Sequence, residues 1–201
     1  MGYYIRVLSK QAEPVPLAAI RDAIVDDDLS AQVLADDDRD DWEAIALAHP
    51  DGDEFVAIER NPVVPGQLGA EELQEFIDEV PNFKPKSAAE WLLSYLPGVK
   101  TIYSLQILGA AEKGDGWATI HAVQAALWSA GGGILQADGE GFSNEDGHHI
   151  LWQFSEGVKG PWQMAVLHED RSWTAFEMDL GRKDHRSEFL EGRVPKGVSL
   201  R

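Results

Sequence analysis

The chain has 201 residues, of which 44% are hydrophobic, so it can bury a sizeable core in one large or two small domains. Its net charge of −18 opposes binding to nucleic acid or to an anionic membrane surface, and favours a small molecule or a basic protein as partner. The absence of cysteine excludes disulfides, thiolate nucleophiles and cysteine-ligated metals. No apolar run is long enough to cross a bilayer and the N-terminus lacks a signal-peptide layout, so we expect a cytoplasmic protein.

Residues 1–62 are predicted to form a first β-α-β-β-β unit. An apolar stripe at helical spacing predicts its helix, and the turn Pro50-Asp51-Gly52-Asp53 predicts a hairpin between its last two strands. The strands are expected over 4–8, 32–36, 44–49 and 55–59, and the helix carries Leu17, Ile20 and Ile24.

Residues 63–99 are predicted to be a helical connector. Leu73, Phe76, Ile77 and Val80 fall at i, i+3, i+4 and i+7, which is typical of one face of a helix. The sequence 87–90, Ser-Ala-Ala-Glu, matches a capping box and predicts the start of a second helix.

Residues 100–181 repeat the order of the first unit. The strand 4–8 matches 104–108, and the hairpin 44–59 matches 163–177 with the same alternation of small and apolar residues. Repeated elements in conserved order predict an internal duplication. The second unit carries an insertion over 139–160, in which the apolar run 150–154 suggests a further strand, and residues 182–201 are expected to form an irregular C-terminal tail.

These elements predict an α+β fold. Two duplicated β-α-β-β-β units, joined by a two-helix connector, would place their helices on one face of a mostly antiparallel sheet. The other face of the sheet would then carry the side chains available for function.

The candidate binding residues are the polar and aromatic side chains expected on that second face. Small-molecule sites combine apolar walls with a few polar anchors, and the last strands each present an aromatic, a small residue and a carboxylate. An ion pair between Arg6 and Glu59 is the structural alternative to a ligand site. The predicted ligand-binding residues are Arg6, Glu59, Gln106, Trp173 and Glu177.

No metal site, cofactor or catalytic residue is predicted. His49 and Glu59 lie about 16 Å apart along their hairpin at the strand rise, too far to share an ion. His148 and His149 are adjacent, so in a strand they point to opposite faces. Gly131-Gly132-Gly133 follows a predicted helix instead of preceding one, which indicates a C-cap and not a phosphate loop.

In element order the two units resemble paired-module families, such as tandem strand-helix-strand-strand effector-binding domains and the vicinal oxygen chelate enzymes. The second resemblance implies metal ligands near Arg6, Glu59, Gln106 and Glu177. Because an arginine does not bind a metal ion, no complete metal site follows from it.

Three functional interpretations remain open. The first is a non-catalytic protein that recognises a small apolar or aromatic molecule on the sheet face between the duplicated modules. The second is an acidic antagonist or adaptor of a basic protein, motivated by the acidic loops Asp26–Asp28 and Asp36–Asp41. The third is a metal-assisted enzyme. The oligomeric state is not predicted.

Overall fold

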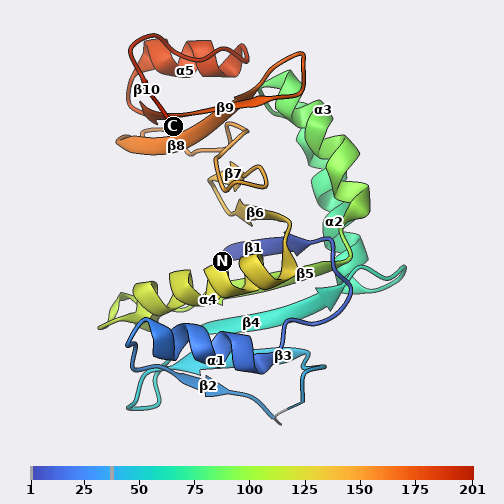
Figure 1. The fold of residues 1–201 in the computed structure, drawn as a ribbon, viewed down its shortest axis with the longest axis vertical. Coiled ribbons are helices and arrows are strands. Elements are labelled where there is room, and N and C mark those ends of the chain that lie inside the picture. Colours follow the sequence, from blue (N-terminus) through green and yellow to red (C-terminus); the bar gives the residue numbers. More distant parts are fainter. Residues whose placement is uncertain (1, 37–38) are drawn as a thin grey trace. The chain divides into compact units, whose positions relative to one another are not determined.

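The computed structural model describes residues 2–36 and 39–201 (Figure 1). It confirms the α+β class and a mostly antiparallel sheet. The chain divides into two compact units, and each is discontinuous in sequence. The first comprises Met1–Glu71 and Val99–Leu135, and the second comprises Glu72–Gly98 and Gln136–Arg201. The division predicted from the sequence follows chain order and has different boundaries.

The first unit is built on a sheet with the strand order β2-β3-β4-β5-β1. β6 lies next to β1, and its last two residues belong to the second unit. The strands are β1 (Tyr3–Ser9), β2 (Gln32–Leu34), β3 (Ala44–Ala48), β4 (Glu54–Pro62), β5 (Thr101–Ile107) and β6 (Ile134–Ala137).

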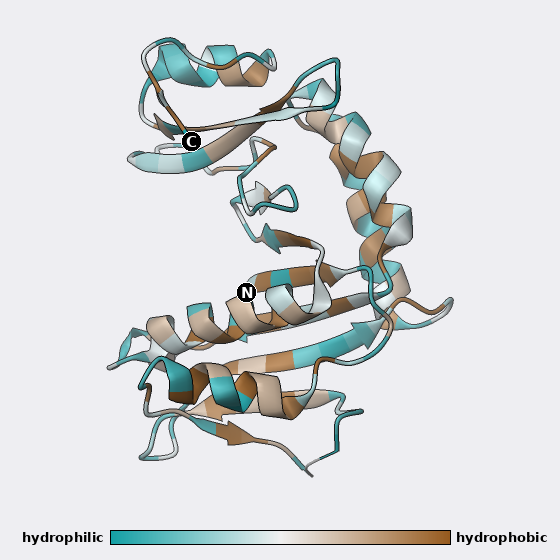
Figure 2. Cartoon of the chain, viewed as in Figure 1, coloured by the Kyte–Doolittle hydropathy of each residue, from teal (hydrophilic) through white to brown (hydrophobic). Residues whose placement is uncertain are grey.

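The central strand β5 pairs antiparallel with β1 on one side and with β4 on the other. The first pairing runs from Tyr3 opposite Ile107 to Ser9 opposite Thr101, over the whole length of both strands. Cross-strand partners share a face of the sheet, so this register divides the side chains into two sets, one on each face of the sheet. Figure 2 shows the hydrophilic residues gathered in the C-terminal part of β4.

Helices α1 (Leu17–Asp26) and α4 (Gly116–Gly131) pack together over one set. Ile20, which belongs to the predicted apolar stripe of α1, is fully buried, and so are Val123 and Leu127 of α4. The facing strand residues are apolar and also buried. They include Ile5 and Val7 of β1, Leu105 of β5, Ile58 of β4 and Leu47 of β3.

Hydrogen bonds hold these helices to the sheet. The hydroxyl of Tyr103 on β5 accepts a hydrogen bond of 2.9 Å from the backbone N–H of Val15, just before α1. The Ser9 hydroxyl donates to the carbonyl of Gly131, at the end of α4, over 2.6 Å. Both buried contacts lie at the same end of the helix layer, because a Cβ on Gly131 would lie 3.7 Å from Val15 Cγ2.

The second unit contains a three-stranded antiparallel sheet with the order β10-β9-β8. An apolar cluster joins this sheet to helix α5, with Met164, Phe176 and Phe189 fully buried. The elements are α3 (Lys86–Tyr95), β7 (Gly141–Phe142), β8 (Pro161–Leu167), β9 (Trp173–Asp179), α5 (Lys183–Leu190) and β10 (Ser199–Leu200). Helix α2 (Leu68–Glu79) begins in the first unit and continues in the second.

The internal duplication and the connector between two modules are not confirmed. Two helices do occupy the segment 63–99, but they do not join two copies of one module. β1, β3 and β4 belong to one sheet. Of their proposed counterparts, β5 lies in that same sheet, whereas β8 and β9 belong to a different sheet. Similar hairpin sequences therefore occur in different arrangements.

Three local predictions differ from the structure. The tail 182–201 contains α5 and β10 and so is not irregular. Residues 150–154 form no strand, and their apolar side chains Ile150, Leu151 and Phe154 are buried instead. Helix α3 begins at Lys86 after Pro85 without a side-chain cap, which places Ser87 inside the first turn.

Among the helices that the structure describes, none combines the length and the apolar character needed to cross a bilayer.

Gly133 provides a test of the link between α4 and β1. Its φ is +106°, and a Cβ at this position would lie 2.0 Å from the carbonyl oxygen of Leu8. We expect Gly133→Ala to lower the free energy of unfolding by at least about 1 to 3 kcal/mol, because it adds a backbone clash to a strained φ. Chemical denaturation monitored by circular dichroism measures this loss.

Gly132→Ala is the matched control. Gly132 also has a positive φ, of +61°, but a Cβ there would meet no atom within 4 Å. Gly132→Ala should therefore cost less than Gly133→Ala, and equal losses in the two variants would contradict the close approach of α4 to β1.

Candidate functional site

Three of the five predicted site residues lie in the first unit. Arg6 is on β1, Glu59 on β4 and Gln106 on β5. Trp173 and Glu177 are both on β9 of the second unit. The first three are brought together by strand pairing, so the candidate site is described from them.

Register places these three side chains on one face of the first sheet. Arg6 is opposite Ser104, and Ser104 is opposite Glu59, which makes one row across three strands. The neighbouring row contains Tyr4, Gln106 and Ala57. We call these six residues the polar face, and it is opposite the face that α1 and α4 cover.

The side chains of the polar face differ in exposure. Glu59 is exposed, and its carboxylate has no hydrogen-bond or ion-pair partner among the described residues. Arg6 is half-buried, and its guanidinium lies over the ring of Tyr4, 5.0 Å from the ring centroid. The ion pair between Arg6 and Glu59, the structural alternative considered above, is therefore not formed.

Small residues extend the polar face toward the sheet edge. Ala57 is opposite Ala46 on β3, and Glu59 is opposite Ala44. These alanines are at least partly exposed. The face is thus a shallow floor with charged and amide groups on one side.

Phe55 does not provide the aromatic wall that the hairpin pattern predicted. The pairing of β3 with β4 is irregular between Leu47 and Ala48, where Phe55 has no paired partner. Its ring is fully buried and packs against the ring of His49 at a centroid distance of 4.6 Å. Tyr4 supplies the aromatic group of the polar face instead.

Ser104 was missed in the sequence analysis of the site. It is 5% exposed, and its buried hydroxyl has no hydrogen-bond partner in the described structure. A serine in a strand carries no distinctive sequence signal, so only the register with β1 and β4 identifies its place between two opposite charges.

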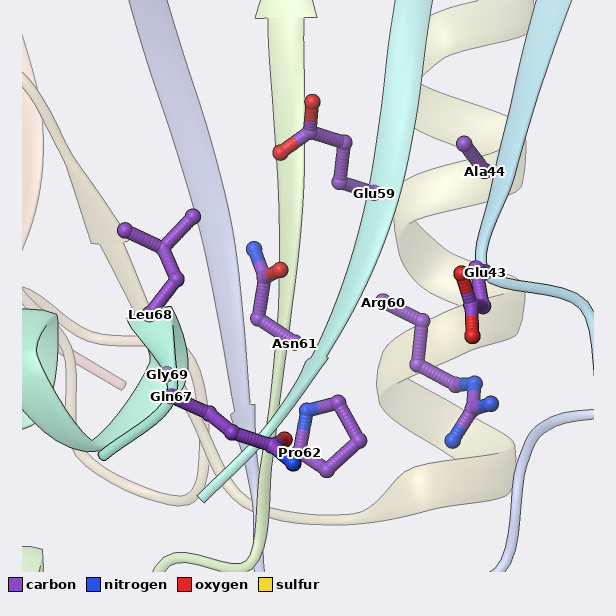
Figure 3. A pocket seen from close by; sticks show the side chains of 9 residues that line it. All are labelled: Glu43, Ala44, Glu59, Arg60, Asn61, Pro62, Gln67, Leu68 and Gly69. Atoms are coloured by element: carbon purple, nitrogen blue, oxygen red, sulfur yellow. The ribbon is translucent and has the colours of Figure 1, made fainter. Parts of the chain in front are cut away.

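A hollow of about 600 Å³ lies at the C-terminal end of β4 (Figure 3). Glu59 and Asn61 project into it from β4, and Leu68 faces them from the start of α2. Its volume falls within the range of small-molecule sites, about 300 to 1,000 Å³. Its lining comprises Glu43, Ala44, Glu59, Arg60, Asn61, Pro62, Gln67, Leu68 and Gly69.

Arg60 is committed to structure within this lining. Its Nε donates to the carbonyl of Trp42 over 2.7 Å, and its Nη2 donates to the carbonyl of Asp41 over 3.1 Å. The Glu43 carboxylate, like that of Glu59, has no partner among the described residues. The unengaged charge of the hollow is therefore negative, which favours a ligand with a cationic group.

The acidic loops lie in the first unit. Asp26 to Asp28 end α1 and are exposed, and Asp36, Asp40 and Asp41 are exposed after β2. The second acidic run also includes residues 37 and 38, which lie outside the described residues. A smaller hollow of about 380 Å³ is lined partly by this loop, with Asp36, Arg39 and Asp41.

The predicted residues of the second unit are already engaged in contacts. Glu177 Oε2 accepts hydrogen bonds of 2.9 Å from Gln163 Nε2 and from Arg201 Nη2. The ring of Trp173 packs edge to face on Trp91 of α3, at a centroid distance of 5.3 Å. A ligand at this face would have to compete with these contacts.

His149 lies between a carboxylate and an aromatic ring. His149 Nε2 lies 3.8 Å from Glu140 Oε2, and its ring stacks on Phe154 at 5.7 Å. Within residues 2–36 and 39–201, no three His, Asp or Glu side chains come together in a way that could hold a metal ion.

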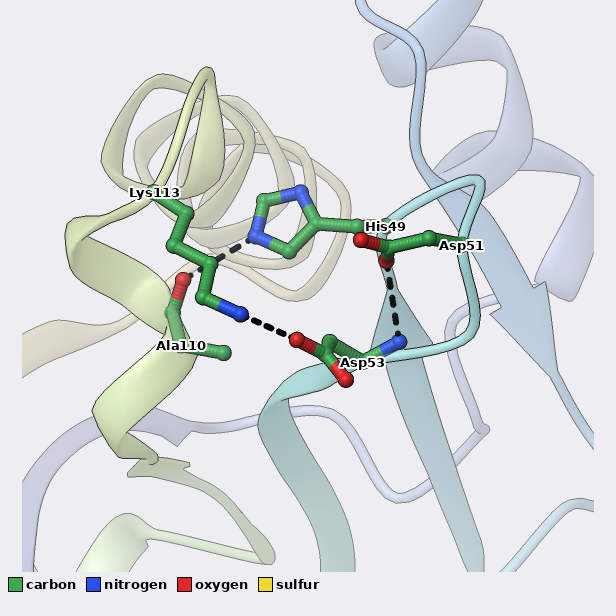
Figure 4. A network of polar contacts seen from close by, with 5 residues as sticks. All are labelled: His49, Asp51, Asp53, Ala110 and Lys113. Atoms are coloured by element: carbon green, nitrogen blue, oxygen red, sulfur yellow. Dashed lines mark hydrogen bonds and ion pairs between the residues drawn. The ribbon is translucent and has the colours of Figure 1, made fainter.

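His49 belongs to a polar network at the β3–β4 turn (Figure 4). His49 Nε2 lies 3.0 Å from the carbonyl oxygen of Ala110, and Lys113 forms an ion pair with Asp53 across the same turn. The hydrogen bond from Lys113, reinforced by its charge, lowers the pKa of the Asp53 carboxyl. The network joins the hairpin to the segment that precedes α4.

Comparison with protein-family models, with curated proteins and with solved structures found no match to this chain. Its function is therefore inferred from its own residues.

The ion pair between Asp53 and Lys113 gives a prediction for pH. Because the pKa of Asp53 is lowered below its ordinary value of 3.8, its stabilisation is present above that pH and is lost as the pH falls through the folded-state pKa. Asp53→Asn should lower the melting temperature slightly at pH 7, since both side chains are more than half exposed.

At a pH well below 3.8, Asp53→Asn should have the same melting temperature as the wild type, because Asp53 is then protonated in both the folded and the unfolded state. Lys113→Met tests the same pair from the other side. If Asp53→Asn lowers the melting temperature by the same amount at both pH values, the loss of stability comes from a change in the turn and not from the ion pair.

Proposed function

We propose that this protein is a non-catalytic binding protein that holds a small apolar or aromatic molecule on the polar face of the first sheet. The observation that carries this proposal is the shared face of Arg6, Gln106 and Glu59, which leads into a hollow that Glu59 helps to line. A face with few polar anchors, an exposed floor and an adjoining concavity is what recognition of a small molecule requires.

The floor supports an apolar or planar body. Ala46 and Ala57 carry only methyl groups, so a ring could approach the sheet closely there. Tyr4 lies in the same row, two strands away from Ala57, and offers an aromatic edge or face. Gln106, between Tyr4 and Ala57, can both donate and accept hydrogen bonds.

The charges support a ligand with a cationic group. Glu59 and Glu43 are exposed and have no partner among the described residues, so binding a cation breaks no existing ion pair. A charge-assisted hydrogen bond to a carboxylate is also stronger than a neutral one.

Glu59→Gln tests this proposal. A thermal-shift screen of a metabolite library identifies a ligand of the wild type, and calorimetry then compares the variants. We expect Glu59→Gln to weaken binding by about tenfold or more, since a hydrogen bond to a charged group contributes about 1.5 to 3 kcal/mol. Without ligand, the variant should have the same melting temperature as the wild type, because the Glu59 side chain is exposed.

Glu54→Gln is the control, because Glu54 is an exposed carboxylate on the same strand outside the polar face. Equal weakening by both substitutions would indicate a general charge effect. A library in which no compound stabilises the wild type would contradict the proposed function.

A basic protein partner is the second candidate function. The exposed aspartates Asp26 to Asp28 precede β2, and Asp36, Asp40 and Asp41 follow it. β2 is the edge strand of the first sheet. Acidic loops on both sides of a sheet edge would attract a basic segment and speed its association.

Salt and charge removal test this candidate. Partners captured on the immobilised protein should be retained at low salt and lost as the Debye length falls from about 10 Å at 0.1 M to about 3 Å at 1 M. The triple variant Asp36→Asn, Asp40→Asn, Asp41→Asn should lose them at low salt as well.

A control variant removes three exposed charges from α2 instead, at Glu71, Glu75 and Glu79. If both triple variants lose the partner equally, attraction depends on net charge alone. A partner that is itself acidic, or binding that is indifferent to salt, would contradict this candidate.

A further inference from the structure

β2 is the outermost strand of the first sheet in the part of the chain that the structure describes (Figure 1). It pairs with β3 on one side, with Gln32 opposite Ala48 and Leu34 opposite Ala46. The backbone N–H and C=O groups on the free side of an edge strand are a template on which another strand can pair. The free side of β2 is therefore a candidate docking surface.

The hydrogen bonds around β3 show which residue of β2 faces outward. The backbone N–H of Arg60 on β4 donates to the carbonyl of Glu43, directly before β3. Because backbone groups in an antiparallel sheet alternate between the two neighbouring strands, Ala46 and Ala48 face β2. Val33 lies between their partners and so turns its N–H and C=O to the free side. Neither group has a hydrogen-bond partner among the described residues.

The side chains at this edge are partly apolar. Leu34 is 40% exposed on one face of β2, and Val33 is half-buried on the other. A strand placed beside β2 would cover both side chains with its own, and burial of apolar surface is favourable. The edge therefore suits a segment with apolar residues at its centre.

The charge around β2 selects between possible strands. The exposed aspartates Asp26 to Asp28 precede β2, and Asp36, Asp40 and Asp41 follow it. A second copy of this chain would bring the same aspartates and a further net charge of −18 to the edge. Repulsion between like charges opposes that pairing, whereas a strand with positive charges beside its apolar centre is attracted.

The smaller hollow lies at the end of this edge. Its volume is about 380 Å³, and its lining begins at Ala35, the residue after β2. Within the lining, Arg39 Nε lies 3.6 Å from Asp41 Oδ1. The carboxylates of Asp36 and Glu43 have no partner among the described residues. When a strand is added to a sheet, main-chain hydrogen bonds give affinity and side-chain pockets give specificity, and this pocket suits a lysine or arginine side chain.

We infer that the free edge of β2 binds an extended basic segment of a protein partner, which adds a strand to the first sheet. This inference rests on the second candidate function, a basic protein partner, and specifies how that partner binds. The backbone of the segment pairs with Val33, and its apolar centre covers Leu34. A basic side chain next to that centre enters the hollow at Asp36.

The test uses the capped peptide Lys-Lys-Val-Thr-Val-Lys-Lys and two counterparts. One counterpart carries N-methyl groups on the three central residues, so it keeps the charges and loses the backbone donors. The other has glutamate in place of each lysine. Titrations of the whole protein at low salt, followed by amide chemical shifts, should show the first peptide binding about tenfold or more tightly than either counterpart. The shifts should centre on residues 32–36, and the Val33 amide should exchange with solvent more slowly.

Val33→Pro and Val33→Ala form a matched pair for the backbone contact. Both replace the valine side chain, and only proline removes the outward N–H. Proline is tolerated on an edge strand where its nitrogen faces away from the sheet, so both variants should fold, which circular dichroism checks. Val33→Pro should bind the first peptide about tenfold more weakly than Val33→Ala. Equal binding by two folded variants would overturn strand addition, and the methylated peptide decides the same question on the wild type.

A double variant tests the hollow. Asp36→Asn combined with Glu43→Gln removes its two carboxylates without a partner and should weaken the first peptide about threefold or more. The control removes two exposed charges from α2, with Glu71→Gln and Glu75→Gln. Equal weakening by the two double variants would overturn the role of the hollow.

The remaining outcomes distinguish this inference from the second candidate function. If the methylated peptide binds as tightly as the first, strand addition is wrong and attraction of a basic partner stands. If the glutamate peptide binds as tightly, the basic character of the segment is wrong. If the first peptide does not bind at its highest soluble concentration, the docking edge is overturned. The second candidate function then fails only if salt-dependent capture also retains no basic protein.

Discussion

The pairing of β5 with β1 and β4 is the constraint on which the candidate site depends. Side chains alternate between the two faces of a strand, so a slip of one residue would exchange the faces. Such a slip would bring Arg6 and Glu59 under α1 and α4 and expose Val7 and Ile58. Burying unpaired charges costs far more than the sheet could recover, and the apolar face therefore fixes the polar one.

Several contacts outside the strands hold this register. Ser9 at the end of β1 donates to Gly131, and the backbone N–H of Lys100 donates to the carbonyl of Ser9 over 2.8 Å. Gly133 allows the chain after α4 to approach Leu8 closely. These contacts fix the end of β1, and β1 in turn positions Arg6 beside Ser104.

The two similar hairpins show how packing changes the role of one sequence pattern. Glu59 and Glu177 occupy equivalent places in the pattern. Glu59 is exposed and has no partner among the described residues, whereas Glu177 binds Gln163 and Arg201. The aromatic residues differ as well, since Phe55 packs on His49 and Trp173 packs on Trp91. The sequence pattern of a strand thus shows which side chains are present, but not which of them remain available to bind a ligand.

The sequence by itself determined the elements that depend on local spacing. The stripe Leu17, Ile20 and Ile24 predicted α1, the turn 50–53 predicted the hairpin, and the glycines after residue 130 predicted the end of α4, where Gly132 is the C-cap. Alternation also placed Arg6 on the side of its strand away from Ile5 and Val7, and Gln106 away from Leu105 and Ile107, because alternation along a strand is a local property. Only the tertiary structure decided which strands are neighbours, and therefore that Ser104 lies between Arg6 and Glu59 and that β8 and β9 form a separate sheet. Strand partners are chosen by long-range packing, which similar hairpins in different surroundings do not share.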